Sequence, residues 1–193
     1  MHFPTPFTPI ESTRIIIRLV APDDLYALSA INSDDAVTRY LPYPSWRNAV
    51  DGQEWLDRTA RRYVAGEAFQ FVMVERSSSA VVGTCLLFNF DPQGHRAEVG
   101  YVLGRAHWAR GLMGEAIASL VEFAFTTLRL LRLTAMLDPR NAPSARLLER
   151  AGFTREGFFR RHGICKGEVI DVAYYGLLRE DTKATTDCVT DAA

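Results

Sequence analysis

The chain has few cysteines and no pairing pattern among them. Cys85, Cys165 and Cys188 form no C-x-x-C motif, and their odd number argues against a disulfide scaffold or a zinc ribbon. None of the four histidines stands at metal-ligand spacing from another histidine or from a cysteine. The sequence therefore predicts no metal site and no disulfide framework.

A surplus of charge and a long apolar run are also missing. The formal net charge is −1, so no basic excess exists to neutralise a nucleic-acid backbone, and direct nucleic-acid binding is not expected. No apolar run approaches the ~20 residues that a membrane span needs. The N-terminus lacks a basic segment followed by an apolar core, the pattern of a signal peptide. These absences predict a cytoplasmic protein without a membrane partner.

What is present suits one globular domain. The chain has 193 residues, of which 48% are hydrophobic and 23% are charged. Residues 1–12 are expected to form a loose N-terminal arm, residues 13–181 the domain, and residues 182–193 a disordered tail.

The residue patterns predict strands and helices in alternation. Strands are expected at 14–20, 69–75, 81–90, 96–103, 132–137, 154–160 and 169–178, and helices at 24–32, 50–65, 111–128 and 141–151. Gly100 within its strand suggests a bulge or a close backbone approach. This order predicts a mixed sheet covered by helices, an α/β or α+β architecture.

The most informative segment is the glycine loop Trp108–Ala116, which leads directly into the longest predicted helix. The first N–H groups of a helix lack partners within it, and the helix dipole adds partial positive charge there. A loop without bulky side chains lets a phosphate come close, so the segment predicts an anion site. Neither the P-loop nor the Rossmann glycine spacing is present. A plain packed turn is the alternative.

This loop resembles the acetyl-CoA pyrophosphate loop of the GNAT superfamily of N-acetyltransferases. Ala97–Leu103 resembles the central strand of that family, and Asn141–Ser144 with Leu147–Phe153 resembles its last helix and Gly-Phe ending.

Two outer segments resemble one branch, the ribosomal-protein alanine N-acetyltransferase type. They are Thr13–Arg18 and the C-terminal set Gly167, Asp171, Tyr175 and 177–181. The resemblance spans roughly residues 12 to 181. It implies a single GNAT-like domain with a central mixed, mostly antiparallel sheet of about seven strands and about four helices.

The resemblance implies direct transfer of an acetyl group from acetyl-CoA to a primary amine, most simply a protein N-terminal amine. A small amine such as an antibiotic, a polyamine or an amino acid is the alternative acceptor, because the fold does not fix the substrate. A non-catalytic acyl-CoA-binding regulatory module and an enzyme that binds another nucleotide or phosphate also stay open. A homodimer is left open.

The cofactor site is expected on three segments. Arg110 and the N–H groups of Gly111, Leu112, Met113 and Gly114 would hold the pyrophosphate. The backbone of Val102 and Leu103 would hold the pantetheine arm and the acetyl oxygen, Asn141 would bond the cofactor, and Arg146 would reach its phosphates. The alternatives without a cofactor role are that Arg110 is a solvated surface charge and that Val102 only fills the core.

Glu98 is the candidate general base, because burial in an otherwise apolar strand would raise the pKa of its carboxyl toward the working pH. The alternative is an ion pair between Glu98 and an arginine on a neighbouring strand.

The leaving thiolate needs a proton donor. Many GNAT members carry a tyrosine on the last helix for this task, and Leu148 stands there in this chain. Ser144 becomes the candidate acid, unless it only completes a cap with Asn141. Tyr40, Tyr43 and Tyr101 are rivals.

The aromatic loop Tyr40–Trp46 is expected either to line the acceptor pocket or to pack inside. Cys85 and Cys165 are not expected to carry the acetyl group, because no histidine lies near either in the sequence.

Overall fold

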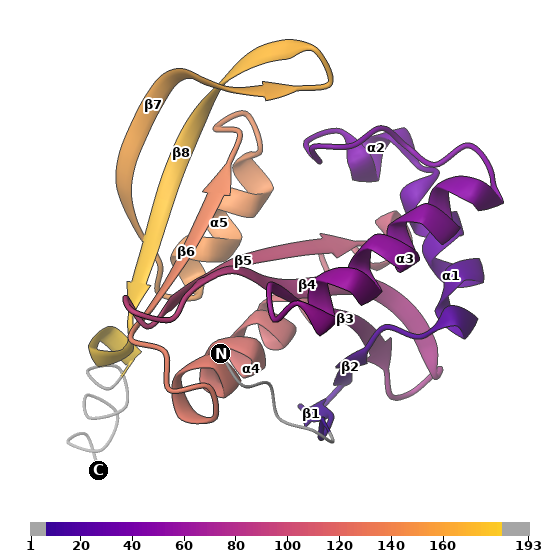
Figure 1. The fold of residues 1–193 in the computed structure, drawn as a ribbon, viewed down its shortest axis with the longest axis horizontal. Coiled ribbons are helices and arrows are strands. Elements are labelled where there is room, and N and C mark those ends of the chain that lie inside the picture. The colour runs from indigo at the N-terminus through magenta and orange to yellow at the C-terminus, as the bar shows by residue number, and fades with distance from the viewer. Residues whose placement is uncertain (1–6, 183–193) are drawn as a thin grey trace.

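The computed structural model describes residues 7–182 and shows one sheet with helices on both faces (Figure 1). The strands are β1 Ile10–Glu11, β2 Ile15–Leu19, β3 Ala68–Glu75, β4 Ala80–Asp91, β5 Arg96–Leu103, β6 Arg132–Leu137, β7 Thr154–Cys165 and β8 Glu168–Leu178. The α-helices are α1 Leu25–Asn32, α2 Asp35–Thr38, α3 Ala49–Val64, α4 Leu112–Thr126 and α5 Ala142–Arg150.

The sheet is mixed and mostly antiparallel, as predicted, with the order β1-β2-β3-β4-β5-β6-β8-β7. Its parallel pair is β5 with β6, and these strands pair only over Arg96–Glu98 against Arg132–Thr134. Beyond Glu98 they diverge, and Figure 1 shows β6 and β8 turning away from β5. This divergence leaves one edge of β5 free and opens the molecule between its two halves.

Alternation along β3 separates two cores. Phe69, Phe71 and Met73 point into the larger core with the buried residues of α4, whereas Val72 points to the opposite face and packs with α1 and α3. Successive strand residues face opposite sides of a sheet, so the continuous apolar sequence of β3 contributes side chains to the cores on both faces. The result is a three-layer molecule in which α1 and α3 cover one face and α4 and α5 the other.

The predicted helices form where their caps indicate. The side chain of Asn48 accepts from two N–H groups at the start of α3, and Gly66, with a φ of 71°, follows its end. Asn141 caps α5 through the N–H of Ser144. The short helix α2 was not predicted, because its four residues carry no apolar period.

Two sequence-based boundaries are wrong. Within the predicted loose arm, Ile10–Glu11 pairs with β2, and the Phe7 ring packs 5.2 Å from that of Phe71. β7 extends five residues past Arg160, because this edge strand is exposed and bulged and so shows no alternation. Most of the predicted disordered tail, from residue 183 on, lies outside the described residues. Within residues 7–182, no helix has the length and apolar character that crossing a membrane requires.

Candidate active site

The divergence of β5 and β6 opens a cleft of about 1960 Å³. Its walls come from α3, β4, β5, the start of α4, α5 and the ends of β7 and β8. Pockets for drug-sized ligands measure about 300–1,000 Å³, so this cleft has room for two reactants placed end to end.

One end of the cleft is built from unpaired backbone donors. Gly111 adopts a φ of 77° just before α4, and the first helical bond runs from the Glu115 N–H to the Gly111 carbonyl at 3.2 Å. The N–H groups of Leu112, Met113 and Gly114 precede that bond and have no helical acceptor.

The side chains of these residues leave the donors accessible. Those of Leu112 and Met113 are buried in the core, so they offer only their backbone to the cleft. A Cβ on Gly114 would meet only a methyl of Leu147, at 3.8 Å, so the space above the helix start is open. Three converging donors at a helix N-terminus fit a diphosphate.

Arg110, which the sequence predicted as a pyrophosphate ligand, is not among the residues that line the cleft. Its Nη2 donates to Glu75 Oε1 at 2.6 Å, and its Nη1 lies 3.1 Å from His107 Nδ1. Glu75 is buried, and hydrogen bonds from Ser78 and then the charge of Arg110 lower the pKa of its carboxyl. Because a buried carboxylate needs a partner, Arg110 is used to neutralise Glu75 and anchor the loop to β3.

Arg14 supplies the cation that sequence reasoning missed. Its Nη1 donates to the Arg110 carbonyl at 3.0 Å, its Nε donates to Glu115 at 2.6 Å, and its side chain lines the cleft. The Nη2 atom lies 3.4 Å from where a Cβ on Gly111 would stand. No local signal could have identified it, since 96 residues separate Arg14 from Arg110.

The start of α5 borders the same end of the cleft. The side-chain oxygen of Asn141 accepts from the Ser144 N–H at 3.3 Å, which is the predicted cap. Asn141 and Arg146 both line the cleft, and Arg146 is exposed without an ion pair in the described part of the chain. A free guanidinium at this position can contact a phosphate.

The free edge of β5 exists without the predicted bulge at Gly100. The pairing of β4 with β5 is continuous from the pair Gly83 and Leu103 to the pair Phe88 and Glu98. The edge of β5 is therefore exposed because β6 diverges from it, and not because of a bulge. The Gly104 N–H donates to the Val82 carbonyl, next to β4. Because the backbone groups of successive strand residues point alternately to the two sides, the N–H of Val102 points to β4 and the N–H of Leu103 points into the gap left by β6. This register favours Leu103 over Val102 as a backbone donor to a ligand.

Glu98 lines the cleft on the α3 side of β5. Its carboxyl is half-buried, and burial raises its pKa, an effect that a hydrogen bond from Asn89 partly offsets. The Asn89 amide donates to Glu98 Oε2 at 3.0 Å, so the partner is neutral and the predicted alternative of an arginine pair is wrong. A carboxylate without a cation at hand is suited to accept a proton.

Ser144 is hydrogen-bonded to Tyr101, one of the alternative proton donors predicted from the sequence. Its Oγ lies 2.7 Å from the hydroxyl of Tyr101, and burial raises the pKa of Tyr101 to about 12. The other tyrosines are engaged elsewhere, Tyr40 with the Arg140 carbonyl and Tyr43 with the side chain of Asn32. Leu148 is fully buried.

The strand alternation sets these groups around the gap. Glu98 belongs to the face of β5 that α3 covers, and Tyr101 belongs to the opposite face with Ser144 on α5. A ligand at the open edge of β5 would therefore have the Glu98 carboxyl on one side and the Tyr101–Ser144 hydroxyl pair on the other.

The aromatic loop is split between both of its predicted roles. Tyr40 and Tyr43 line the cleft, whereas Trp46 is buried and packs 5.6 Å from Trp55. Cys85 is a core residue, and burial raises the pKa of its thiol. Cys165 donates from Sγ to the Leu41 carbonyl at the rim of the cleft.

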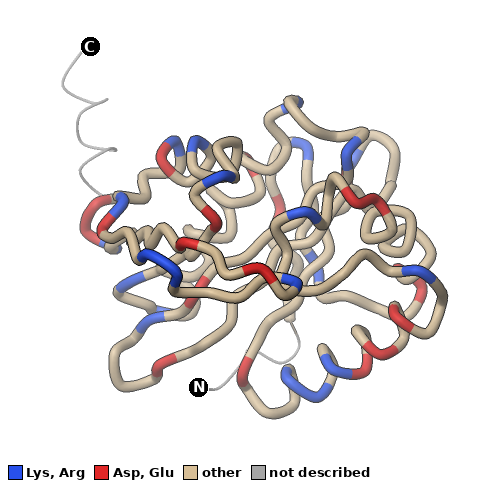
Figure 2. Tube along the Cα trace, turned by 90° about the horizontal axis from the view of Figure 1, so that it is seen from above, with Lys and Arg blue, Asp and Glu red and all other residues tan. Residues whose placement is uncertain are grey.

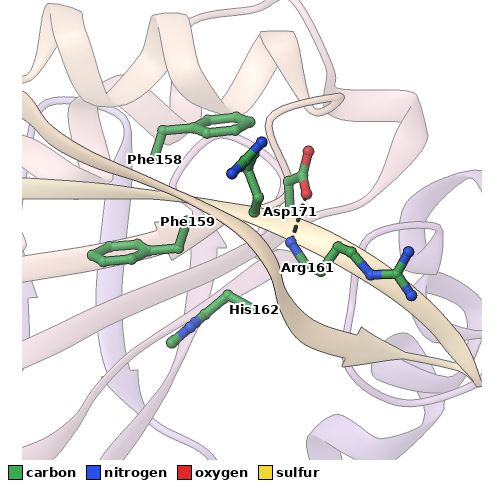
Figure 3. A pocket seen from close by; sticks show the side chains of 6 residues that line it. Phe158, Phe159, Arg161, His162 and Asp171 are labelled. Atoms are coloured by element: carbon green, nitrogen blue, oxygen red, sulfur yellow. Dashed lines mark hydrogen bonds between the residues drawn. The ribbon is translucent and has the colours of Figure 1, made fainter.

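A second, shallow hollow of about 670 Å³ lies on the β7–β8 hairpin (Figure 3). Phe159 and His162 project to one side of β7 and Phe158 to the other, and the Arg161 N–H donates to Asp171 at 2.7 Å. His162 also lines the large cleft.

Residues 14–154 match the family model described as an acetyltransferase (GNAT) domain. This chain belongs to the GNAT family of acetyltransferases. It is 32% identical over 172 residues to the uncharacterized N-acetyltransferase p20 of Bacillus licheniformis, which covers 89% of this chain and 97% of that protein. It is therefore an acetyl-CoA-dependent N-acetyltransferase, as the sequence predicted.

Two further acetyltransferases are similar over most of the chain. The [ribosomal protein uS5]-alanine N-acetyltransferase of Escherichia coli (strain K12) is 24% identical over 181 residues, 89% of this chain and 91% of that protein. The crystal structure of a GNAT-family acetyltransferase from Bacillus anthracis matches with a TM-score of 0.81 at 25% identity, over 90% of this chain and 99% of that chain.

Proposed function

We propose that this acetyltransferase moves the acetyl group of acetyl-CoA directly to the α-amine of a polypeptide N-terminus, with Glu98 as the general base. The observation that carries the proposal is the half-buried Glu98 carboxyl, which has a raised pKa and a neutral partner and lies beside the free edge of β5. Similarity to the alanine N-acetyltransferase named above supports a peptide as acceptor.

The residues at the loop end of the cleft would hold the cofactor. The N–H groups of Leu112 to Gly114 would bind the diphosphate, and Arg14 and Arg146 would add positive charge there. The unpaired edge of β5 would bind the pantetheine amides by strand-like hydrogen bonds. Acetyl-CoA then brings an activated acyl group to the gap between Glu98 and Ser144.

Each catalytic demand has a residue to meet it. Glu98 accepts the proton that the attacking amine must lose, through a chain of waters that bridges the distance to the amine. The Leu103 N–H donates to the acetyl oxygen as it gains negative charge, an effect worth about 3 kcal/mol per donor in other enzymes. As the C–S bond breaks, Ser144 donates its proton to the leaving sulfur and takes the proton of the Tyr101 hydroxyl, which solvent then restores. No covalent enzyme intermediate is required.

Turnover against an acceptor panel tests this function. Purified protein would be given acetyl-CoA with peptides beginning in Ala or Ser, polyamines, aminoglycosides or free amino acids, and thiol release would be followed. We expect release with the peptides. Tight binding of CoA with no turnover on any acceptor would instead favour a non-catalytic acyl-CoA-binding module, and a preference for ATP over CoA would indicate another kind of enzyme.

The hydroxyl pair is expected to act as one unit. Because a general acid contributes typically 10²–10⁴-fold, Ser144→Ala should lower kcat by roughly 10²-fold, and Tyr101→Phe by less. The double variant should be about as slow as Ser144→Ala alone, since the second change removes nothing further. Multiplicative effects in this cycle would show that the two hydroxyls act independently.

Removing the Asn89 amide should shift the pH profile. The hydrogen bond from Asn89 lowers the pKa of Glu98, so Asn89→Gly should raise it and move the acidic limb of kcat/KM to higher pH. Glycine suits this position because Asn89 has a φ of 50°. An unmoved limb would show that another group controls it.

A further inference from the structure

We infer that the acceptor carries a carboxylate within its first few residues, and that Arg58 and Arg62 of α3 bind this group. The inference rests on the proposed function, because it names the kind of N-terminus that the same cleft takes.

The acceptor side of the cleft has unbalanced positive charge. Among the acids that line the cleft, Glu115 pairs with Arg14 at 2.6 Å, and Asp138 pairs with Arg140 at 2.6 Å. Glu98 is then the lining acid without an ion pair in the described residues.

Arg58 and Arg62 line the same space together with Arg39 of the α2 loop. Over the described residues the two signs are interspersed (Figure 2), and the net charge of the chain is −1, so this excess is local.

The two α3 arginines share one helix face. Residues four apart on a helix lie one above the other, and Trp55 and Thr59 of the same face also line the cleft. Within residues 7–182, the one ion pair of either arginine joins Arg62 to the exposed Glu67, at a long distance of 3.8 Å. The charge of Arg58 reaches the hydroxyl of Tyr43, where it acts to lower the pKa. Both guanidinium groups are thus available to a ligand.

Their position relative to the base sets the reach. The Cζ of Arg62 lies 5.8 Å from the centre of the Phe88 ring, and Phe88 is the strand partner of Glu98. Paired residues in antiparallel strands are direct neighbours on one face of a sheet, so the Phe88 side chain lies next to Glu98 and beneath the guanidinium of Arg62. Because an extended chain spans about 3.5 Å per residue, the first few residues of a peptide can extend from Glu98 over Phe88 toward Arg62.

This reach distinguishes two sources of carboxylate. The α-carboxylate of a free amino acid is attached to the carbon that bears its amine, so it extends less far from Glu98 than a side-chain carboxylate further along a peptide. The side chain of Asp or Glu at the second or third position of a peptide can extend toward Arg62 while the amine is at Glu98. Arginine binds carboxylates through paired N–H groups, which favours such a peptide over a neutral one. A polyamine would meet like charge.

The test compares amidated peptides that differ only in charge: Ser-Glu-Glu-Gly, Ser-Gln-Gln-Gly and Ser-Lys-Lys-Gly, with free glutamate as a fourth acceptor. At low ionic strength we expect kcat/KM for the Glu peptide to exceed that for the Gln peptide about tenfold or more, the usual scale of hydrogen bonds to charged groups. The Lys peptide should be slowest, and free glutamate should not match the Glu peptide.

Variants assign the effect to the arginines. Arg58→Gln and Arg62→Gln should lower kcat/KM for the Glu peptide more than for the Gln peptide and so reduce the Glu-over-Gln preference. Arg62→Glu should reverse the preference, so that the Lys peptide reacts faster than the Glu peptide. Arg61→Gln is the matched control, because Arg61 is an exposed residue of the same helix that does not line the cleft.

Two failures remain distinguishable. Turnover of the Gln peptide with equal rates for all three charges would overturn the inference and leave the proposed function standing. No turnover of any peptide would overturn the proposed function itself. A faster reaction of free glutamate would show a carboxylate bound beside the amine, which contradicts the assignment to Arg58 and Arg62.

Discussion

Glu98→Gln is expected to lower kcat by about 10²- to 10⁴-fold, the usual contribution of a general base. Glutamine keeps the size of the side chain, and its carbonyl can still accept the hydrogen bond from Asn89, but it cannot take a proton from the amine. The KM for acetyl-CoA should stay close to that of the wild type, because Glu98 faces α3 and not the loop before α4 that we propose binds the diphosphate. Steady-state thiol release at saturating acceptor measures both quantities.

The pH dependence of the same variant is a second readout. Activity requires ionised Glu98, and burial raises the pKa of its carboxyl, so wild-type kcat/KM should fall on acidification at a pH above that of a free carboxylate. Glu98→Gln should lose this acidic limb.

The sign of the effect on stability follows from linkage. Between the ordinary pKa and the raised one, the unfolded chain ionises first, so burying Glu98 destabilises the fold as the pH rises. The neutral variant avoids this cost and should unfold no more easily than the wild type at pH 7, which thermal denaturation can check.

Glu122→Gln is the matched control for this variant, because Glu122 is an exposed residue of α4 away from the cleft. It should leave kcat unchanged. Wild-type activity in Glu98→Gln, or an unchanged acidic limb, would remove Glu98 from the role of base.

Gly114→Glu is expected to weaken the binding of CoA by about 100-fold or more while the fold is retained. The new carboxylate would occupy the open space above the N–H groups that start α4, and like charges held together cost several kcal/mol. The helix itself should tolerate the change, because glycine is about 1 kcal/mol less favourable than better helix formers and an acid in the first turn suits the helix dipole. Titration calorimetry with CoA and thermal denaturation give the two measurements.

Gly114→Ala separates size from charge. A Cβ at this position meets only a methyl of Leu147 at 3.8 Å, so alanine should fit, stabilise α4 slightly and leave CoA binding largely intact. Unchanged affinity in Gly114→Glu would mean that the diphosphate binds elsewhere than at the start of α4.

The sequence by itself determined those features whose causes are local. The glycine loop and the start of α4 follow from a few adjacent residues, as does the Asn141 cap of α5. The mixed sheet follows from the order of the elements, and Glu98 stands out because it is a charged residue within an apolar strand. In each case the decisive interaction joins residues that are neighbours in the chain or lie on one element.

Only the tertiary structure decided the pairings between distant segments. Arg110 matches an anion-binding motif, yet it pairs with Glu75 from another strand, and Arg14 lies in the cleft instead. The hydroxyls of Tyr101 and Ser144 meet across 43 residues, and the β5 edge is opened by divergence from β6 and not by a bulge. A residue's charge predicts that it needs a partner, but which partner lies nearest depends on how the whole chain packs, and local sequence does not contain that distance.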